Sequence, residues 1–360
     1  MERFSKIKNY IINSDFKTAI VIALSIILLG VFFGWYNNKV VPINATASAR
    51  YTLEPGNPLS FLSNWDGPNY LNIAKNGYSY NETNFLPLYP ILIHAVNLII
   101  PSELDSAIII SWLSLLVLIY FYLKIIKVLF EDTAVDRLKA VWFLLLFPTA
   151  IFFLATYTES LFALLAFGAI YFVLTKKYYY SAIFAMFMSA THITAIFVLL
   201  LLGLLMWENK ATIKQIIING MIGLLGLLAY MFYLEETFHK PLAFILTQKN
   251  HGWLSEHYGN IFTSIDIFNV IFIILIISAS VYWWHKKRSF SLYALSFLLI
   301  PLVGQQFGGF NRYVLMIFPI PLMFYRLSKN RPNLALIYIA ISSVAWTYFL
   351  LQYAGGYVGG

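Results

Sequence analysis

The chain has 360 residues, of which 60% are hydrophobic, 18% aromatic and 11% charged. Soluble proteins carry roughly a quarter charged residues, so this composition excludes a soluble enzyme and indicates a polytopic membrane protein. The chain has no cysteine, which excludes disulfides, thiolate metal sites and a cysteine nucleophile. The formal net charge of +8 does not indicate nucleic-acid binding, because most of the positive charges lie on one side of the predicted membrane.

The first predicted element is a membrane span at about residues 18–35. Basic residues precede it, and it is long enough to cross a bilayer core of about 30 Å. A signal peptide is the alternative, because Ala47-Ser48-Ala49 resembles a cleavage site. That site lies well beyond the apolar run, and the run is too long for a signal core. We therefore predict an uncleaved anchor with the N-terminus in the cytoplasm.

A polar, aromatic and turn-rich stretch follows at residues 64–90, reading NWDGPNYLNIAKNGYSYNETNFLPLYP. Pro68 suits the first turn of a helix and Gly77 suits the position just past its end, so the pattern predicts a short helix over Asn69–Asn76. Asp66 lies immediately before the positive end of this helix, where the dipole and free N–H groups stabilise a carboxylate. Such a carboxylate serves as a general base or as a helix cap, and the local pattern leaves both open.

The order WDGPNYLNIAKNGY followed by FLPLYP resembles the opening signature of the PIG-V type mannosyltransferases. The family pattern is an aromatic-Asp pair, a Tyr-Leu-x-Ile-Ala helix, Gly-Tyr and then Phe-x-Pro-Leu-Tyr-Pro. The resemblance implies an integral membrane glycosyltransferase of the GT-C type that uses a lipid-phosphate sugar as donor. It also implies that Asp66, in the first outward-facing loop, is the catalytic base, and that Trp65, Tyr70 and Tyr78 contact the donor or the acceptor.

The remaining apolar segments predict an all-helical fold with eleven crossings and the C-terminus outside. Residues 85–100 form only a short apolar stretch that Pro87 and Pro90 interrupt, so we predict an interfacial helix there rather than a crossing. The further crossings are predicted at about residues 106–123, 140–156, 160–175, 181–191, 193–207, 212–234, 263–284, 289–304, 313–327 and 333–352. The whole chain, residues 1–360, is thus predicted to be one transmembrane domain.

The distribution of charge supports this topology. The predicted inner segments hold 18 of the 24 Lys and Arg residues and six of the 16 carboxylates. The outer side holds six cationic residues and ten carboxylates. An excess of Lys and Arg marks the cytoplasmic side of membrane proteins. One missed or extra crossing would exchange the sides of all later segments and reduce the charge difference between the two sides.

The two largest outer segments are predicted at residues 37–105 and 235–262. The second contains His239, His251 and His257, whose spacings match no compact metal motif. We therefore predict that this loop covers the active site or contacts a sugar acceptor. The hypothesis includes no cofactor and no metal ligand, and it leaves metal dependence open.

Glu159 stands at a predicted outer turn, within the sequence Tyr-Thr-Glu-Ser. An acid that faces lipid at such a depth costs roughly 3 kcal/mol, so we expect Glu159 to face a cavity or a partner. The family carries a Tyr-Ser/Thr-Glu-Ser element after a span containing Phe-Pro, which implies a structural or acceptor-positioning role. The alternative is a helix start in which Thr158 or Ser160 is the cap.

His192 lies between two predicted helices that are each shorter than the roughly 20 residues of an ordinary span. Such a pair predicts a shallow hairpin whose tip lies below the membrane surface. The family usually has Ala-Thr-Arg at this tip, where the arginine is a plausible contact for the lipid phosphate. A neutral histidine donates one hydrogen bond rather than a charged fork, so a phosphate contact and a structural histidine both remain open.

Arg312 directly precedes a predicted span, in the sequence RYVLMIFP. This resembles the Arg-Tyr-x-Leu-x-x-Phe-Pro element of the family. A guanidinium there is suited to bind the donor phosphate and to stabilise it as it leaves. The alternative is an arginine that snorkels at a helix end.

Together these patterns favour an inverting glycosyltransferase that moves a sugar, most simply mannose, from a polyprenyl-phosphate carrier. The acceptor is a glycan, lipid or protein on the extracytoplasmic side of the cell membrane, and membrane lipids surround the enzyme. No Gly-rich nucleotide loop or DxD motif occurs, which fits a donor other than a sugar nucleotide. The alternatives are a polytopic lipid or solute transporter, which typically shows inverted repeats, and a non-catalytic assembly subunit.

Overall fold

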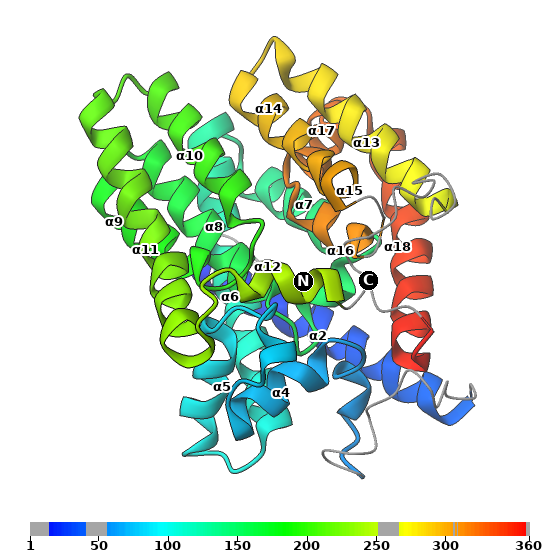
Figure 1. The fold of residues 1–360 in the computed structure, drawn as a ribbon. Helices are drawn as coiled ribbons and strands as arrows, with labels where there is room; N and C mark the ends of the chain where they lie inside the picture. Colours follow the sequence, from blue (N-terminus) through cyan, green and yellow to red (C-terminus); the bar gives the residue numbers. More distant parts are fainter. Residues whose placement is uncertain (1–13, 41–55, 251–265, 305–306, 308, 358–360) are drawn as a thin grey trace.

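A computed structural model describes residues 14–40, 56–250, 266–304, 307 and 309–357. Every regular element in these ranges is a helix (Figure 1). The all-helical fold class is therefore confirmed for the described chain. The predicted outer segments 37–105 and 235–262 are described only in part, and His251 and His257 lie outside the described residues.

Helices long and apolar enough to span a membrane occur at five places in the described ranges. They are α2 (Asp15–Val40), α6 (Glu103–Phe130), α11 (Ile213–Phe238), α13 (Ile267–Trp284) and α18 (Pro332–Gly355). Each coincides with a predicted span.

The other helices are shorter. They are α4 (Gly67–Asn76), α5 (Leu88–Asn97), α7 (Ala134–Leu145), α8 (Glu159–Leu174), α9 (Tyr178–Ser189), α10 (Ala195–Glu208), α12 (Ala243–Asn250), α14 (Arg288–Ser296), α15 (Leu299–Gly304), α16 (Phe310–Tyr313) and α17 (Pro319–Ser328), with 3-10 turns η1 (Ser60–Leu62), η2 (Tyr80–Glu82), η3 (Ala150–Phe153) and η5 (Val314–Met316). At about 1.5 Å per residue, the ten residues of α5 reach about 15 Å, half of a bilayer core. This length agrees with the expectation that residues 85–100 do not cross.

Three predicted spans are not single helices. The segment 140–156 ends as α-helix at Leu145 and continues through Pro148 into η3, since a proline cannot donate the helical hydrogen bond. The segment 313–327 consists of the end of α16, then η5 and α17, and Pro319 begins the last of these. Pro319 has no N–H to donate to a preceding carbonyl, so a helical hydrogen bond is missing at that point. The segment 289–304 is divided as well, because α14 ends at Ser296 and α15 begins at Leu299. The prediction of one continuous helix was wrong at all three places.

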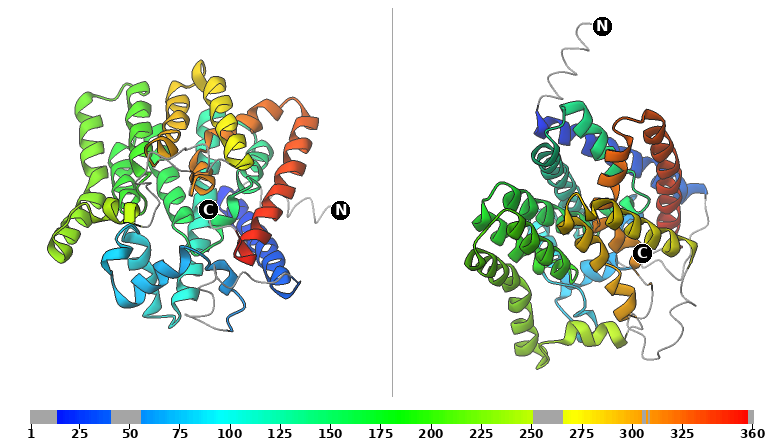
Figure 2. Two further views of the ribbon diagram at one scale, coloured as in Figure 1. Left: turned by 45° about the vertical axis from the view of Figure 1, so that its right-hand side comes forward. Right: turned by 90° about the horizontal axis from the view of Figure 1, so that it is seen from above.

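The helices pack so that residues far apart in sequence meet at one end. α6 lies against α2 and α8, α9 lies against α8 and α11, and α18 lies against α2. Figures 1 and 2 show α9, α10 and α11 together on one side of the molecule and α18 on the other. The short helices α4 and α5 lie at the lower end in Figure 1.

A second set of contacts joins the start of α2, the end of α6, α7, the end of α17 and the turn before α18. Asp15 pairs with Lys124 at 3.0 Å and with Arg137 at 2.9 Å. Asp132, whose side chain is fully buried, has three partners: Tyr325, Arg326 and Lys329. We call these residues the basic cluster. These residues lie in predicted cytoplasmic segments or at the predicted cytoplasmic ends of spans, so the structure brings together segments that the prediction puts on one side of the membrane.

Candidate active site

Asp66 precedes α4, which contains Pro68 in its first turn and ends at Gly77 with φ of 79°. The predicted short helix is confirmed. Asp66 occupies the N-cap position, yet its side chain makes no capping hydrogen bond. The carboxylate is engaged by a different group, which lies far away in the sequence.

That group is Arg312, at the end of α16. Its Nη1 lies 2.5 Å from Oδ2 of Asp66, and its Nε lies 2.9 Å from Oε1 of Glu159. The side chains are 12%, 7% and 2% exposed for Asp66, Arg312 and Glu159, so all three are largely withdrawn from solvent. We call these three residues the acid–arginine cluster. It contains two carboxylates and one guanidinium.

Glu159 is the first residue of α8. Thr158 precedes that helix without a capping hydrogen bond, and the hydroxyl of Ser160 donates to the carbonyl of Phe153 instead. The capping alternative therefore fails for both hydroxyls. Glu159 faces a partner, as the cost of a lipid-facing acid led us to expect.

Tyr157 contacts two members of the cluster, Asp66 and Arg312. The backbone N–H of Asp66 donates to the Tyr157 hydroxyl at 3.1 Å, and that hydroxyl donates to the carbonyl of Asn64 at 3.0 Å. The guanidinium of Arg312 lies 5.2 Å from the centre of the Tyr157 ring, within the range of a cation–π contact. One buried tyrosine thus fixes both the base candidate and its cationic partner.

Gly67 allows the loop to approach the rest of the protein closely. A Cβ added there would lie 2.6 Å from Oγ1 of Thr156 and 2.8 Å from Oγ of Ser63. The neighbouring backbone is also tied, since the N–H of Thr156 donates to the carbonyl of Leu62 at 2.9 Å. The close approach holds Asp66 against the segment that leads to Glu159.

Trp65 adopts φ of 56°, in the left-handed region, and its side chain is 40% exposed. A bulky residue there is strained, at a cost of order 1–3 kcal/mol, and such strain is typical of functional loops. The loop therefore turns sharply immediately before Asp66 and leaves the indole accessible.

A small cleft of about 20 Å³ opens beside the cluster, with room for about one water molecule. Its walls combine polar and apolar side chains from segments far apart in sequence. They are Asp66, Tyr70, Asn84, Phe85, Leu86, Thr191, His192, Ile193, Gln248, Arg312 and Tyr313. Gln248 belongs to α12, so the described part of the segment 235–262 does reach the cleft.

His192 lines this cleft and belongs to the loop between α9 and α10. Its Nδ1 is 2.8 Å from Oγ1 of Thr194, and its ring centre is 5.2 Å from that of Tyr313. Burial, and secondly the charge of Arg312, lower the pKa of His192 to about 3. The imidazole is therefore neutral at ordinary pH, and it stands beside the arginine rather than replacing it.

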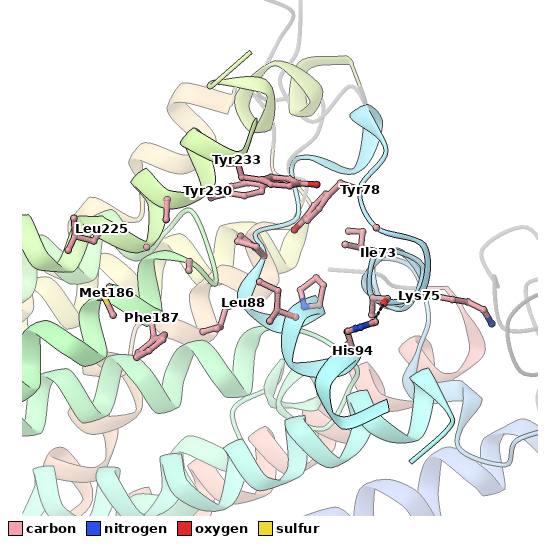
Figure 3. Close-up of a pocket in the computed structure, with 18 residues that line it drawn as sticks. Ile73, Lys75, Tyr78, Leu88, His94, Met186, Phe187, Leu225, Tyr230 and Tyr233 are labelled. Atoms are coloured by element: carbon pink, nitrogen blue, oxygen red, sulfur yellow. Dashed lines mark hydrogen bonds between the residues drawn. The ribbon is translucent and has the colours of Figure 1, made fainter. Parts of the chain in front are cut away.

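Tyr70 and Tyr78 lie on different sides of the segment 83–86. Tyr70 is buried, lines the cleft and packs its ring 4.9 Å from that of Phe85. Tyr78 donates its hydroxyl to the carbonyl of Phe85 at 2.7 Å and faces a second, larger cavity (Figure 3). The structure thus brings Asp66, Tyr70, Glu159, His192 and Arg312 together, places Trp65 next to them and separates Tyr78 from the cleft.

Four residues at this site were not singled out from the sequence. Tyr157 belongs to the element that contains Glu159, and Tyr313 follows Arg312, so the motifs themselves pointed to both. Asn84 lies in the signature stretch but outside its distinctive residues. Gln248 gave no signal beyond its place in a polar segment.

Comparisons with known proteins agree with these motifs. The family model described as mannosyltransferase (PIG-V) matches residues 56–248, which is more than half of the chain. This range includes Asp66, Glu159 and His192 but not Arg312. Two similar proteins are named GPI mannosyltransferase 2. The one from Drosophila pseudoobscura pseudoobscura is 38% identical over 122 residues, covering 31% of this chain and 26% of the relative.

The protein of that name from Drosophila melanogaster is 32% identical over 115 residues, covering 29% of this chain and 26% of the relative. The similarity thus extends over about a quarter of the length of each relative. The match to the family model is much longer, and it contains the signature stretch and the helices α4 to α11 around it. On this match, the chain belongs to the PIG-V mannosyltransferase family.

Proposed function

We propose that the protein is a membrane enzyme that transfers mannose from a polyprenyl-phosphate carrier to an acceptor hydroxyl. The observation that carries this proposal is the pairing of Asp66 with Arg312 beside a cleft. It puts a carboxylate that can accept a proton next to a guanidinium that can bind a phosphate. The family and the apolar helices support a mannosyl group and a membrane setting.

The reaction needs one displacement. The acceptor oxygen attacks the anomeric carbon and forms the new glycosidic bond, while the bond from that carbon to the phosphate oxygen breaks. The hydroxyl proton passes to the carboxylate of Asp66, and the electron pair of the broken bond leaves with the lipid phosphate. Attack from the face opposite the leaving group inverts the anomeric configuration, so one base suffices.

Arg312 is assigned to the phosphate. A guanidinium has five N–H donors in a rigid fork, and the two ion pairs described above engage Nη1 and Nε. Arg312 can therefore keep Asp66 in place while it donates to the departing phosphate, whose charge it stabilises in a largely water-free site. Glu159 acts as a positioning residue, because it fixes the guanidinium from the opposite edge.

The remaining candidates are assigned to substrate contacts. Trp65 presents an accessible indole at the mouth of the loop, which suits stacking on a sugar ring. Tyr70 and neutral His192 line the cleft and can orient a hydroxyl group. Tyr78 contacts the donor from the second cavity. The acceptor is a glycan, lipid or protein on the outer face of the cell membrane.

The proposal retains the predicted topology, with the N-terminus inside, the C-terminus outside and eleven crossings, some of them broken. The distribution of charge supports it, since the basic cluster gathers cations at segments predicted to be cytoplasmic. The acid–arginine cluster lies beside α4, in the predicted outer segment.

Incubation of the purified protein with defined donors and a membrane lipid extract tests the proposed function. We expect polyprenyl-phosphate mannose to be consumed and nucleotide-activated mannose to remain intact. Proton NMR of the product should show the anomeric configuration opposite to that of the donor. Consumption of the nucleotide sugar, or retention of configuration, would contradict the proposal.

A further inference from the structure

A second cavity, of about 760 Å³, lies between the pair α4–α5 and the pair α9–α11 (Figure 3). Ile73 and Leu88 form one wall, and Phe187 and Leu225 form the other. We call this cavity the groove. Its volume lies in the range of roughly 300–1,000 Å³ that is usual for small-molecule sites. It is far larger than the cleft beside Asp66.

The wall of the groove is suited to a hydrocarbon chain. Its polar groups largely have partners within the protein: the Tyr230 hydroxyl donates to the carbonyl of Thr83 at 2.8 Å, and Nδ1 of His94 lies 2.9 Å from the carbonyl oxygen of Ala74. Tyr78 is likewise bound to a backbone carbonyl, as described above. A sugar or a headgroup would lose hydrogen bonds to water here, whereas an apolar chain would lose none.

The groove opens on the side of the molecule where the membrane is expected. Ile91, Phe187 and Leu225 on its walls are 58%, 43% and 48% exposed. Leu225 lies on α11, a candidate span in which only 17% of the apolar window is buried. An apolar chain can therefore enter sideways from the bilayer without passing through water.

The groove and the cleft lie back to back. Leu86 and Thr191 line the cleft, while their neighbours Pro87 and Ala190 line the groove. The two strips of chain touch, since the N–H of Leu88 donates to the carbonyl of Ala190 at 2.9 Å. Helix α4 also connects the cleft to the groove. It begins next to Asp66, and its last residues line the groove. The ten residues of the helix span about 15 Å.

We infer that the groove holds the polyprenyl chain of the sugar donor, an inference that rests on the proposed function. A donor whose phosphate is bound by Arg312 in the cleft has one long apolar chain that must leave from that point. The groove is the adjoining apolar space, and it is open to the bilayer. This assignment gives Tyr78 its role, since its ring forms the end of the groove nearest the segment that separates it from the cleft (Figure 3).

Filling the groove tests the inference. Ala229 lines the groove and is exposed, so Ala229→Phe adds bulk without disturbing the core. Leu228→Phe is the matched control, because Leu228 is exposed on the same helix and is not a lining residue. We expect Ala229→Phe to raise KM about tenfold for a full-length polyprenyl-phosphate mannose and to leave it unchanged for a donor with a ten-carbon chain. An equal change for both donors, or no change, would overturn the inference.

Cross-linking separates this outcome from a failure of the proposed function. A photoreactive polyprenyl phosphate without sugar should label residues 220–235 of the native protein and of Leu228→Phe, but not of Ala229→Phe. That pattern would support the groove even if no mannose were transferred. Labelling of all three proteins, or labelling only by a photoreactive diacyl phospholipid, would show that the groove holds bulk membrane lipid and would overturn the inference.

Discussion

Two ionic clusters in the described part of the chain combine carboxylates and cations in opposite proportions. In the basic cluster, each carboxylate faces two cations: Asp15 faces Lys124 and Arg137, and Asp132 faces Arg326 and Lys329. In the acid–arginine cluster, one cation faces two carboxylates. The basic cluster therefore has a formal net positive charge. The acid–arginine cluster has a formal net negative charge, and its side chains are largely buried.

The difference separates a structural site from a reactive one. A carboxylate that is surrounded by cations has little tendency to accept a proton, and its contacts join helix ends. A carboxylate that shares its only cation with another acid, beside a cleft, can accept a proton when the substrate supplies one. The two clusters should therefore respond differently to the loss of one charge.

Asp66→Asn gives the largest expected effect. An amide of the same shape cannot accept a proton, so turnover should fall by about 10² to 10⁴. The fold should persist, because an amide oxygen can still accept the hydrogen bond from Arg312 and Glu159 still balances the charge of that guanidinium. Initial rates with polyprenyl-phosphate mannose, together with a thermal unfolding curve, measure both quantities. Turnover close to normal would remove Asp66 from the chemistry and direct attention to Glu159.

Asp132→Asn should do the reverse. The substitution leaves Lys329 and Arg326 without their counter-charge, and we expect a loss of about 2 kcal/mol of stability. This is below the value for a fully buried pair because both cations are about a third exposed. Turnover per folded molecule should not change. Thermal unfolding in detergent measures the loss, and a fall in turnover with unchanged stability would contradict the comparison.

Arg312→Lys should have a smaller effect on binding. Lysine keeps the charge but loses the planar fork, so it cannot hold two carboxylates and a phosphate at once. We expect the KM for the donor to rise by about tenfold, the size of one lost charge-assisted hydrogen bond. Arg326→Lys in the basic cluster is the matched control and should leave KM unchanged. Equal donor affinity in Arg312→Lys and the native enzyme would argue for an anchoring role.

The smallest effect on the enzyme is expected from single cysteine substitutions. These substitutions test on which side of the membrane each of the two clusters lies. Ser79→Cys lies on the exposed side of the α4 segment, and Asn330→Cys lies in the exposed turn beside the basic cluster. In intact cells, an impermeant thiol reagent should label the first and not the second, while activity remains. The opposite pattern would place the acid–arginine cluster in the cytoplasm.

Local patterns predicted the short elements best. The helix after Asp66 and the short helix at residues 88–97 follow from proline and glycine positions, because these residues fix backbone conformation without help from distant groups. Other prolines explain why two of the three divided spans are not single helices. Hydropathy registers the apolar character of residues 140–156 and 313–327, but not the hydrogen bonds that Pro148 and Pro319 remove.

The assembly of the site could not be derived from local pattern. Asp66 and Arg312 are separated by 246 positions, and no spacing rule links them. Resemblance to a family named both residues without indicating that they pair. Tyr157 belongs to a motif, but its contact with the backbone of Asp66 depends on how α8 packs beside α4. Such contacts are set by tertiary packing, which a single sequence does not display.

The close approach at Gly67 limits which amino acids this position can tolerate. Gly67 has no reactive group, yet even the methyl group of alanine would lie within 3 Å of the hydroxyl oxygens of Thr156 and Ser63, so the loop or these side chains must shift. We therefore expect saturation mutagenesis to find codon 67 nearly as intolerant as codon 66. A position without a functional group would then be under nearly the same selection as the candidate base beside it.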